Sequence, residues 1–144
     1  MNFPKPGKLD VPGKPDTPDK PEKMGFEGLA AAEQVKLGDC LWDIHAAGMK
    51  VLEFTSGRDF ADYAESDLLQ GVVTSMLAII AARLDDVRTG FPDEFVKIDH
   101  ANRLIAVGAP EHPFTAETVW RVVEELLPDA VTSTRTVLED WHQA

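Results

Sequence analysis

Residues 66–88 read SDLLQGVVTSMLAIIAARLDDVR, and this stretch decides the fold. Its apolar side chains recur at steps of three and four residues, which is the spacing of an α-helix. They cover more than one helix face, at Leu68, Leu69, Val72, Val73, Met76, Leu77, Ile79, Ile80 and Leu84. Because a helix that is apolar on several faces must be surrounded by other elements, we predict a central helix. Ser66 is its expected N-cap and Thr89-Gly90 its expected end.

The same helical spacing continues on both sides of this central helix. Further helices are expected at residues 26–55, 59–64, 95–107, 115–127 and from 128 to the C-terminus. The expected boundary signals are Gly57, Thr115 as an N-cap, Pro128 and a proline-broken loop at 109–114. One face of 95–107 is expected to carry Phe95, Ile98, Asn102 and Ile105, and Leu104 and Val107 are expected to extend it. Since no segment shows strand alternation, we predict an all-α, up-and-down bundle of four main helices plus one or two short helices.

The N-terminal region differs in composition from the rest of the chain. Its first 23 residues hold six of the ten prolines and five lysines, with almost no apolar side chain to bury. We therefore expect a disordered, Pro/Lys-rich arm at residues 1–24 and a single helical domain at 25–144. The arm is either a linker-like tail or a docking segment whose spaced prolines form a polyproline II ligand. We do not expect it to be a signal peptide, because no apolar run follows its lysines.

Charge and cysteine content exclude several classes of function. The net charge is −11, and because the arm has five lysines against four acids, the remaining residues carry −12. Such a charge opposes the broad basic surface that nucleic acids require. One cysteine, Cys40, allows neither a disulfide framework nor a cysteine zinc site, and we expect a buried, inert thiol. The longest apolar run is too short for a bilayer, so a cytoplasmic protein without membrane contact is predicted.

The sequence offers little for metal or cofactor chemistry. A carboxylate-bridged metal site in a bundle needs two Glu-x-x-His pairs and two further glutamates. Only Glu139 and His142 have that spacing here, and they lie at the C-terminus. No glycine-rich phosphate loop is present. We therefore predict no metal and no cofactor.

Residues 35–138 resemble the HepT-like members of the HEPN superfamily. The resemblance is carried by Asp43-Ile44, Phe54-Thr55-Ser56-Gly57, Asp67-Leu68-Leu69, Phe95 with Ile98, Val119-Trp120-Arg121-Val122-Val123 and Leu126-Leu127-Pro128, in that order. Members of that family are helical ribonuclease toxins encoded beside a minimal nucleotidyltransferase. The resemblance implies a dimer whose subunits bring together the arginine and histidine of an R-x(4–6)-H-x-Y motif. In members of that family, the arginine and histidine of this motif cleave RNA without metal.

The stretch ANRLIAVGA, residues 101–109, matches the spacing of this motif but not its chemistry. Ala101 stands at the arginine position, Val107 at the histidine position and Ala109 at the tyrosine position, and only Asn102 matches the family's asparagine. Family members often carry Gly-Glu on the central helix where this chain has Ala81-Ala82. The resemblance therefore implies a HEPN-like bundle without its catalytic groups.

Three hypotheses remain open. The first is a HepT-like protein without ribonuclease activity that acts as a binding or assembly subunit. It would form a homodimer through residues 102–109, with a minimal nucleotidyltransferase antitoxin as the suggested partner. The second is an active, metal-independent endoribonuclease that binds RNA with a relocated site drawn from His100, Asn102, Arg103 and His112. The third is an unrelated helical interaction module with the proline-rich arm as its docking element.

Overall fold

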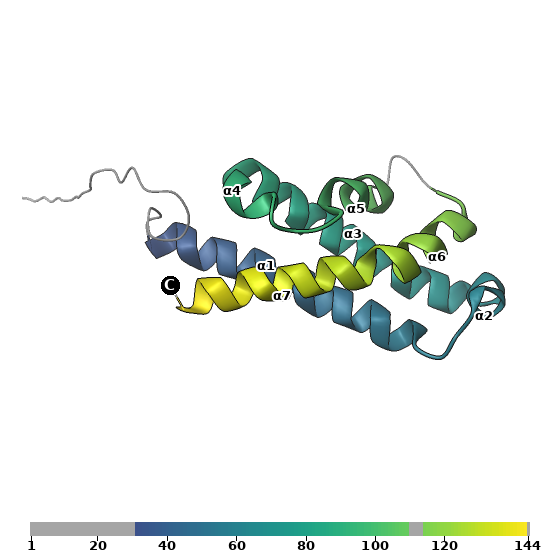
Figure 1. The fold of residues 1–144 in the computed structure, drawn as a ribbon. Helices are drawn as coiled ribbons and strands as arrows, with labels where there is room; N and C mark the ends of the chain where they lie inside the picture. Colours follow the sequence, from purple (N-terminus) through teal and green to yellow (C-terminus); the bar gives the residue numbers. More distant parts are fainter. Residues whose placement is uncertain (1–30, 110–113, 144) are drawn as a thin grey trace, which may run out of the picture.

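The computed structural model describes residues 31–109 and 114–143, and this part of the chain forms seven helices and no strand (Figure 1). In chain order they are α1 (Ala31–Thr55), α2 (Phe60–Glu65), α3 (Asp67–Gly90), α4 (Pro92–Phe95), α5 (Ala101–Gly108), α6 (Ala116–Glu125) and α7 (Leu127–Gln143). The predicted all-α class is confirmed. The predicted arm at 1–24, the first residues of the predicted helix at 26–55 and His112 lie outside the described residues.

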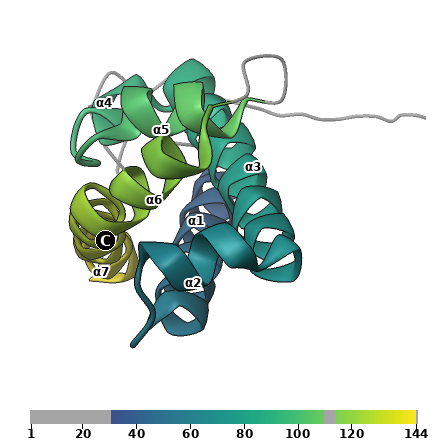
Figure 2. The same cartoon turned by 90° about the vertical axis from the view of Figure 1, so that its right-hand side faces the viewer.

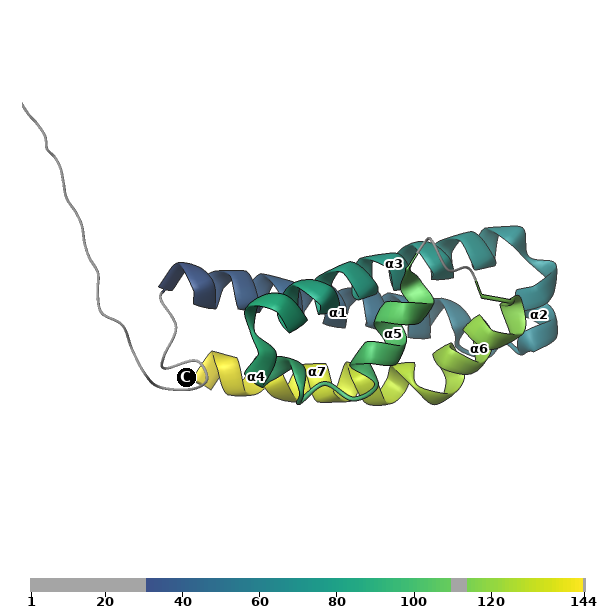
Figure 3. The same ribbon diagram turned by 90° about the horizontal axis from the view of Figure 1, so that it is seen from above.

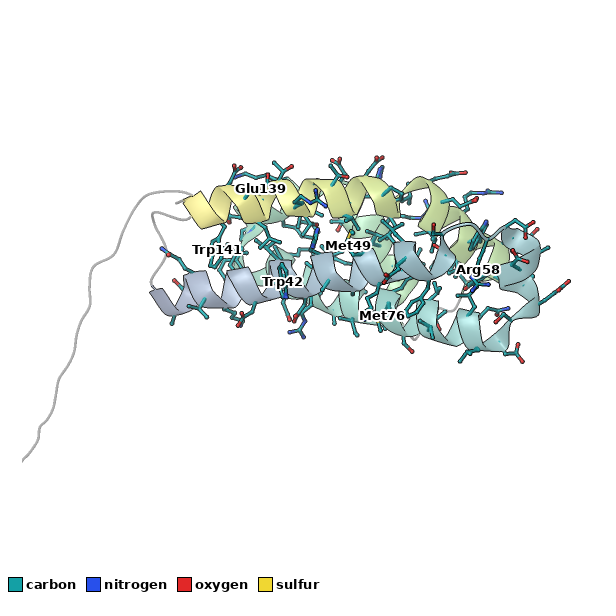
Figure 4. All side chains as sticks on the ribbon, turned by 90° about the horizontal axis from the view of Figure 1, so that it is seen from below. Trp42, Met49, Arg58, Met76, Glu139 and Trp141 are labelled. Carbon is teal, nitrogen blue, oxygen red and sulfur yellow. The ribbon has the colours of Figure 1, made fainter. Side chains whose placement is uncertain are left out.

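The helices form an up-and-down bundle in which the chain passes along the bundle four times. The chain runs along α1, returns along α3, goes back through α4 and α5, and returns again through α6 and α7 (Figure 3). Helix α1 packs against both α3 and α7, and α5 packs against α3. Seen along the bundle, α4, α5 and α6 cover one side of the layer made by α1, α3 and α7 (Figure 2). No described helix covers the opposite side of α1 (Figure 4).

The expected helix boundaries follow from local hydrogen bonds. The Ser66 hydroxyl accepts a hydrogen bond from the Leu69 amide at 3.0 Å, and the Thr115 hydroxyl accepts one from the Thr118 amide at 3.2 Å. Both side chains therefore satisfy amide groups that have no partner within their own helix. Gly57, just after α1, has φ +76°, the left-handed conformation for which glycine carries no steric penalty. These predicted caps are confirmed.

The predicted helix at 95–107 is wrong, because the chain breaks it at His100. Helix α4 ends at Phe95, residues 96–100 form turns, and His100, in the left-handed conformation with φ 62°, is the N-cap of a separate helix, α5, that begins at Ala101. The predicted apolar face is correct at Phe95, Ile98, Leu104 and Val107, which are buried, and wrong at Asn102. The buried residues of α5 are Ala101, Leu104 and Val107, whereas Asn102 is exposed.

The central role predicted for α3 is confirmed by its packing. Helix α3 contacts α1, α2, α4 and α5, and its buried residues are Leu69, Val73, Leu77, Ile80, Ala81, Leu84 and Val87. By length and apolar composition α3 also resembles a membrane-spanning helix, a property that core helices of bundles share.

Candidate functional site

Helix α5 and its C-cap, Ala109, contain the positions that the family resemblance assigns to catalysis, and two of these positions face the interior. Ala101 is 4% exposed and Val107 is 8% exposed, because this side of α5 packs against α3. Gly108 brings the two helices close together: a Cβ on Gly108 would lie 2.6 Å from the Cβ of Ala81. An arginine at 101 or a histidine at 107 would therefore have to enter the core of its own subunit.

Two hollows lie beside the end of α5. The first, of about 350 Å³, includes Val107, Gly108 and Ala109 in its lining, and its described lining has the hydroxyls of Thr74 and Ser75 but no titratable side chain. The second, of about 290 Å³, joins Gly108 and Ala109 to Ala81, Ala82, Asp85 and Arg88. The fold thus brings together the two segments singled out by the resemblance, Ala81-Ala82 and the end of the motif stretch. Their shared surface consists mainly of small apolar side chains.

The polar residues considered for a relocated catalytic site lie beside other groups instead. His100 Nε2 lies 3.3 Å from Asp129 Oδ2 of α7, and the Asn102 side-chain oxygen accepts a hydrogen bond from Arg88 at 3.3 Å. Arg103 lines a hollow of about 180 Å³ together with Arg121 of α6. His100 thus faces α7, whereas Arg103 faces α6, so these two candidates do not form a pair of an acid–base group and a cation.

A larger hollow lies on another part of the bundle, between α1 and α7. We call it the α1–α7 groove. Its volume is about 510 Å³, its walls are mainly apolar, and it is lined by Gly38, Asp39, Trp42, His45, Arg135, Leu138, Glu139 and Trp141. In Figure 4, Trp42 on α1 and Trp141 on α7 lie on facing helices, with Glu139 at the upper rim. Trp42 is 61% exposed, an unusual position for so large an apolar side chain.

Glycine on α1 creates the space for this groove. A Cβ on Gly38 would lie 2.5 Å from the ring of Trp141, so the indole can rest on α1 only because residue 38 has no side chain. Ten residues further along α1, a Cβ on Gly48 would lie 2.5 Å from a methyl group of Val131. The two glycines therefore bring α7 close to α1, and Gly38 also places the second tryptophan of the groove.

His45 forms part of the groove wall as a neutral ring. Its ring stacks with that of Trp42 at a centroid distance of 6.0 Å, and its Nε2 is buried without a hydrogen-bond partner in the described part of the chain. Burial, and secondarily the charge of Arg135, lower the pKa of His45. The imidazole is thus uncharged at neutral pH. The charged groups of the lining are Asp39, Glu139 and Arg135.

Sequence reasoning missed this groove. The apolar spacing of residues 26–55 predicts a helix but does not single out Trp42 or Gly38. The pairing of Gly38 with Trp141 spans the whole domain, so helical periodicity could not reveal it. A local signal was available: Val35, Trp42 and Met49 recur every seven residues, and all three are exposed.

The remaining candidates for chemistry are a metal-binding cluster and the single cysteine. No group of three or more His, Cys, Asp or Glu side chains in residues 31–109 and 114–143 is arranged to hold a metal ion. Cys40 is buried, and burial raises the pKa of its thiol, with the nearby carboxylate of Asp86 as the second cause. The expected inert thiol fits this environment. No protein-family model, curated protein or solved structure matches the chain.

Proposed function

We propose that this chain is a non-catalytic binding and assembly protein whose working surface is the α1–α7 groove. The observation that carries the proposal is an open, mainly apolar groove between two helices that presents Trp42 and Trp141. Leaving an apolar side chain in water forgoes roughly 25 cal/mol for each Å² that a partner would cover. Tryptophan is also the side chain most enriched where binding energy concentrates in protein interfaces. An exposed indole beside a hollow therefore supports binding.

The surroundings of the motif helix agree with a protein that does not cleave RNA. Two of its three motif positions are buried as Ala101 and Val107, and His100 pairs with a carboxylate of α7. Metal-free RNA cleavage needs a positioned acid–base group together with charge stabilisation. The kinship with HepT-like proteins and a nucleotidyltransferase partner remain predictions. A homodimer through α5 also remains a prediction, and it would have to use the exposed side chains of α5, since Ala101 and Val107 are covered within the subunit.

The chemistry of the groove favours an extended, proline-containing segment as ligand. Grooves walled by aromatic rings accept polyproline II segments, because proline rings pack flat against them and such segments lose little entropy on binding. Trp42, Trp141 and the neutral His45 provide the rings. Asp39 and Glu139 outnumber Arg135 in the lining, which favours a ligand with basic residues beside its prolines.

Tryptophan resonances provide a direct test of this proposal. The chain has three tryptophans, and Trp120 is buried beside Tyr63, with a centroid distance of 5.3 Å, so it serves as an internal reference. A synthetic peptide with proline at every third position and lysine between should shift the indole N–H signals of Trp42 and Trp141 but not that of Trp120. Replacing Trp42→Ala should weaken binding by about tenfold or more, as at an interface hot spot.

The matched control for this variant is Leu68→Ala. Leu68 is 80% exposed at the start of α3, at the end of the bundle opposite to the groove, so its replacement should leave the affinity unchanged. Equal affinities of the parent and the Trp42→Ala protein, or no shift of either groove signal at saturating peptide, would remove the basis of the proposal.

A further inference from the structure

The α1–α7 groove also has a candidate occupant within the same chain. We propose that residues 12–21, PGKPDTPDKP, fold back and dock in the groove as a polyproline II segment, so that the chain covers its own binding surface. This inference rests on the proposed function, because it names the first ligand of the same groove. It gives the N-terminal arm a regulatory role: an external partner has to displace it.

The spacing of the prolines supports this docking. Pro12, Pro15, Pro18 and Pro21 recur every three residues, and a polyproline II helix has three residues per turn. All four rings therefore lie along one edge of such a helix. Of the other two prolines of the arm, Pro4 falls outside this register, and Pro6 shares it but is separated from Pro12 by Leu9, so the uninterrupted series begins at Pro12.

The dimensions of the two surfaces agree. At about 3.1 Å per residue, successive prolines of the segment stand roughly 9 Å apart. At about 1.5 Å per residue, the exposed side chains Val35, Trp42 and Met49 stand roughly 10 Å apart along α1. Figure 4 shows Trp42 and Met49 along α1, on the side of the bundle that no described helix covers. We call these three side chains the apolar strip. Two or three successive prolines can thus lie over successive side chains of the strip.

The charges of the segment also separate onto different edges. In the same three-residue register, Lys14 and Lys20 share one edge, and Asp16 and Asp19 share another. The groove lining contains two carboxylates and one guanidinium, so it attracts the lysine edge. The two lysines and two aspartates leave residues 12–21 without net charge, so the segment is not repelled by the −12 of the remaining chain, and its attraction to the groove depends on the lysine edge.

The connection between the segment and the groove is long enough. Nine residues lie between Pro21 and Ala31, where the described chain begins, and the ten steps from Pro21 to Ala31 can span up to roughly 33 Å. Trp42 lies about 16 Å along α1 from Ala31. The arm can therefore reverse direction and run back along α1. A tether of this length gives the segment an effective concentration of about a millimolar, so modest contacts suffice to hold it.

The test compares two variants of the full-length chain. In the first, Pro12, Pro15, Pro18 and Pro21 are replaced by alanine; in the control, Pro4 and Pro6 are replaced by alanine. If the segment occupies the groove, the first variant should shift the indole N–H signals of Trp42 and Trp141 relative to the parent, with Trp120 unchanged. The control should match the parent at all three signals. The external proline-rich peptide should bind the first variant more tightly than the parent, because the internal competitor has been weakened.

The possible outcomes separate this inference from the proposed function. Identical indole signals in the parent and the first variant, with the peptide binding both equally, overturn the docking of residues 12–21 and leave the binding function standing. Failure of the peptide to bind the first variant overturns the proposed function itself. Light scattering distinguishes a third outcome. If the parent is a dimer and the first variant is a monomer, the segment docks in the groove of a second copy, which overturns docking within one chain.

Discussion

Replacing Gly108 by alanine should destabilise the protein, although the same change in most helices is stabilising. A Cβ at this position would lie 2.6 Å from Ala81 Cβ and closer still to the carbonyl oxygen of Leu77, while ordinary contact begins at 3.4 Å. The carbonyl belongs to the backbone of α3 and cannot rotate away as a side chain would. Helix α5 therefore has to move outward by most of an ångström.

The size of the effect follows from two opposing contributions. Alanine gains about 1 kcal/mol over glycine from helix propensity, whereas overpacking a core typically costs about 1–3 kcal/mol. The displacement also loosens Leu104, which is 1% exposed, and burial of a leucine is worth about 1.5–3 kcal/mol. We expect a net loss of about 1–2 kcal/mol in the free energy of unfolding, measured by urea denaturation with an unchanged slope.

Gly71→Ala is the matched control. Gly71 lies in the exposed part of α3, and a Cβ there meets nothing within 4 Å, so this variant should gain about 0.5–1 kcal/mol. If Gly108→Ala is as stable as Gly71→Ala, then α5 is not held against α3 as described, and the burial of Ala101 and Val107 can no longer be used to argue against a catalytic motif.

Three further predictions concern residues near the same helices. Glu94 is 2% exposed, and burial raises the pKa of its carboxyl group. Because the folded state favours the protonated carboxyl group, stability is lost as pH rises above the ordinary range of glutamate pKa values. In thermal denaturation, Glu94→Gln should therefore be more stable than the parent at neutral pH, with a smaller difference at about pH 4. His100→Gly should be as stable as the parent or up to about 1 kcal/mol more stable, since glycine relieves the left-handed conformation, and a loss above 1 kcal/mol in urea denaturation would contradict this. The double replacement Ala101→Arg with Val107→His should lower the free energy of unfolding by more than about 3 kcal/mol and create no RNA cleavage, because both side chains enter the core. The exposed control Asn102→Arg should leave the free energy of unfolding nearly unchanged. A stable double variant that cleaves RNA would restore the ribonuclease hypothesis.

Much of the fold was predictable because it depends on local rules. The apolar spacing of residues 66–88 identified the central helix, and Ser66 and Thr115 marked two helix starts by their ability to accept amide hydrogen bonds. The break at His100 was not predictable in the same way. Nothing in its own sequence stops the helix; tertiary packing favours two short helices over one continuous helix. Histidine is one of the residues that tolerate the left-handed conformation.

The candidate sites show where a sequence argument loses information. Spacing alone placed Ala101 and Val107 on a helix but could not say whether they face solvent or the interior, because that depends on the rotation of α5 against α3. The groove depends on a contact between Gly38 and Trp141, which are remote in sequence. In both cases the missing quantity is the relative position of two helices, to which the pattern within one helix is insensitive.

The outer face of α1 provides the remaining argument for a covered surface. A face that only meets water is expected to carry polar side chains at every turn. Here Val35, Trp42 and Met49 instead form an apolar strip, with charged residues such as Asp43 and Lys50 beside it. An apolar centre with a charged margin is the usual arrangement of a protein interface. Because α4, α5 and α6 lie over the other side of the α1, α3 and α7 layer (Figure 2), no described helix can cover this strip without leaving the core. Any cover for this strip has to come from another segment or another molecule, and the three-residue proline register of residues 12–21 makes that segment the first candidate to test.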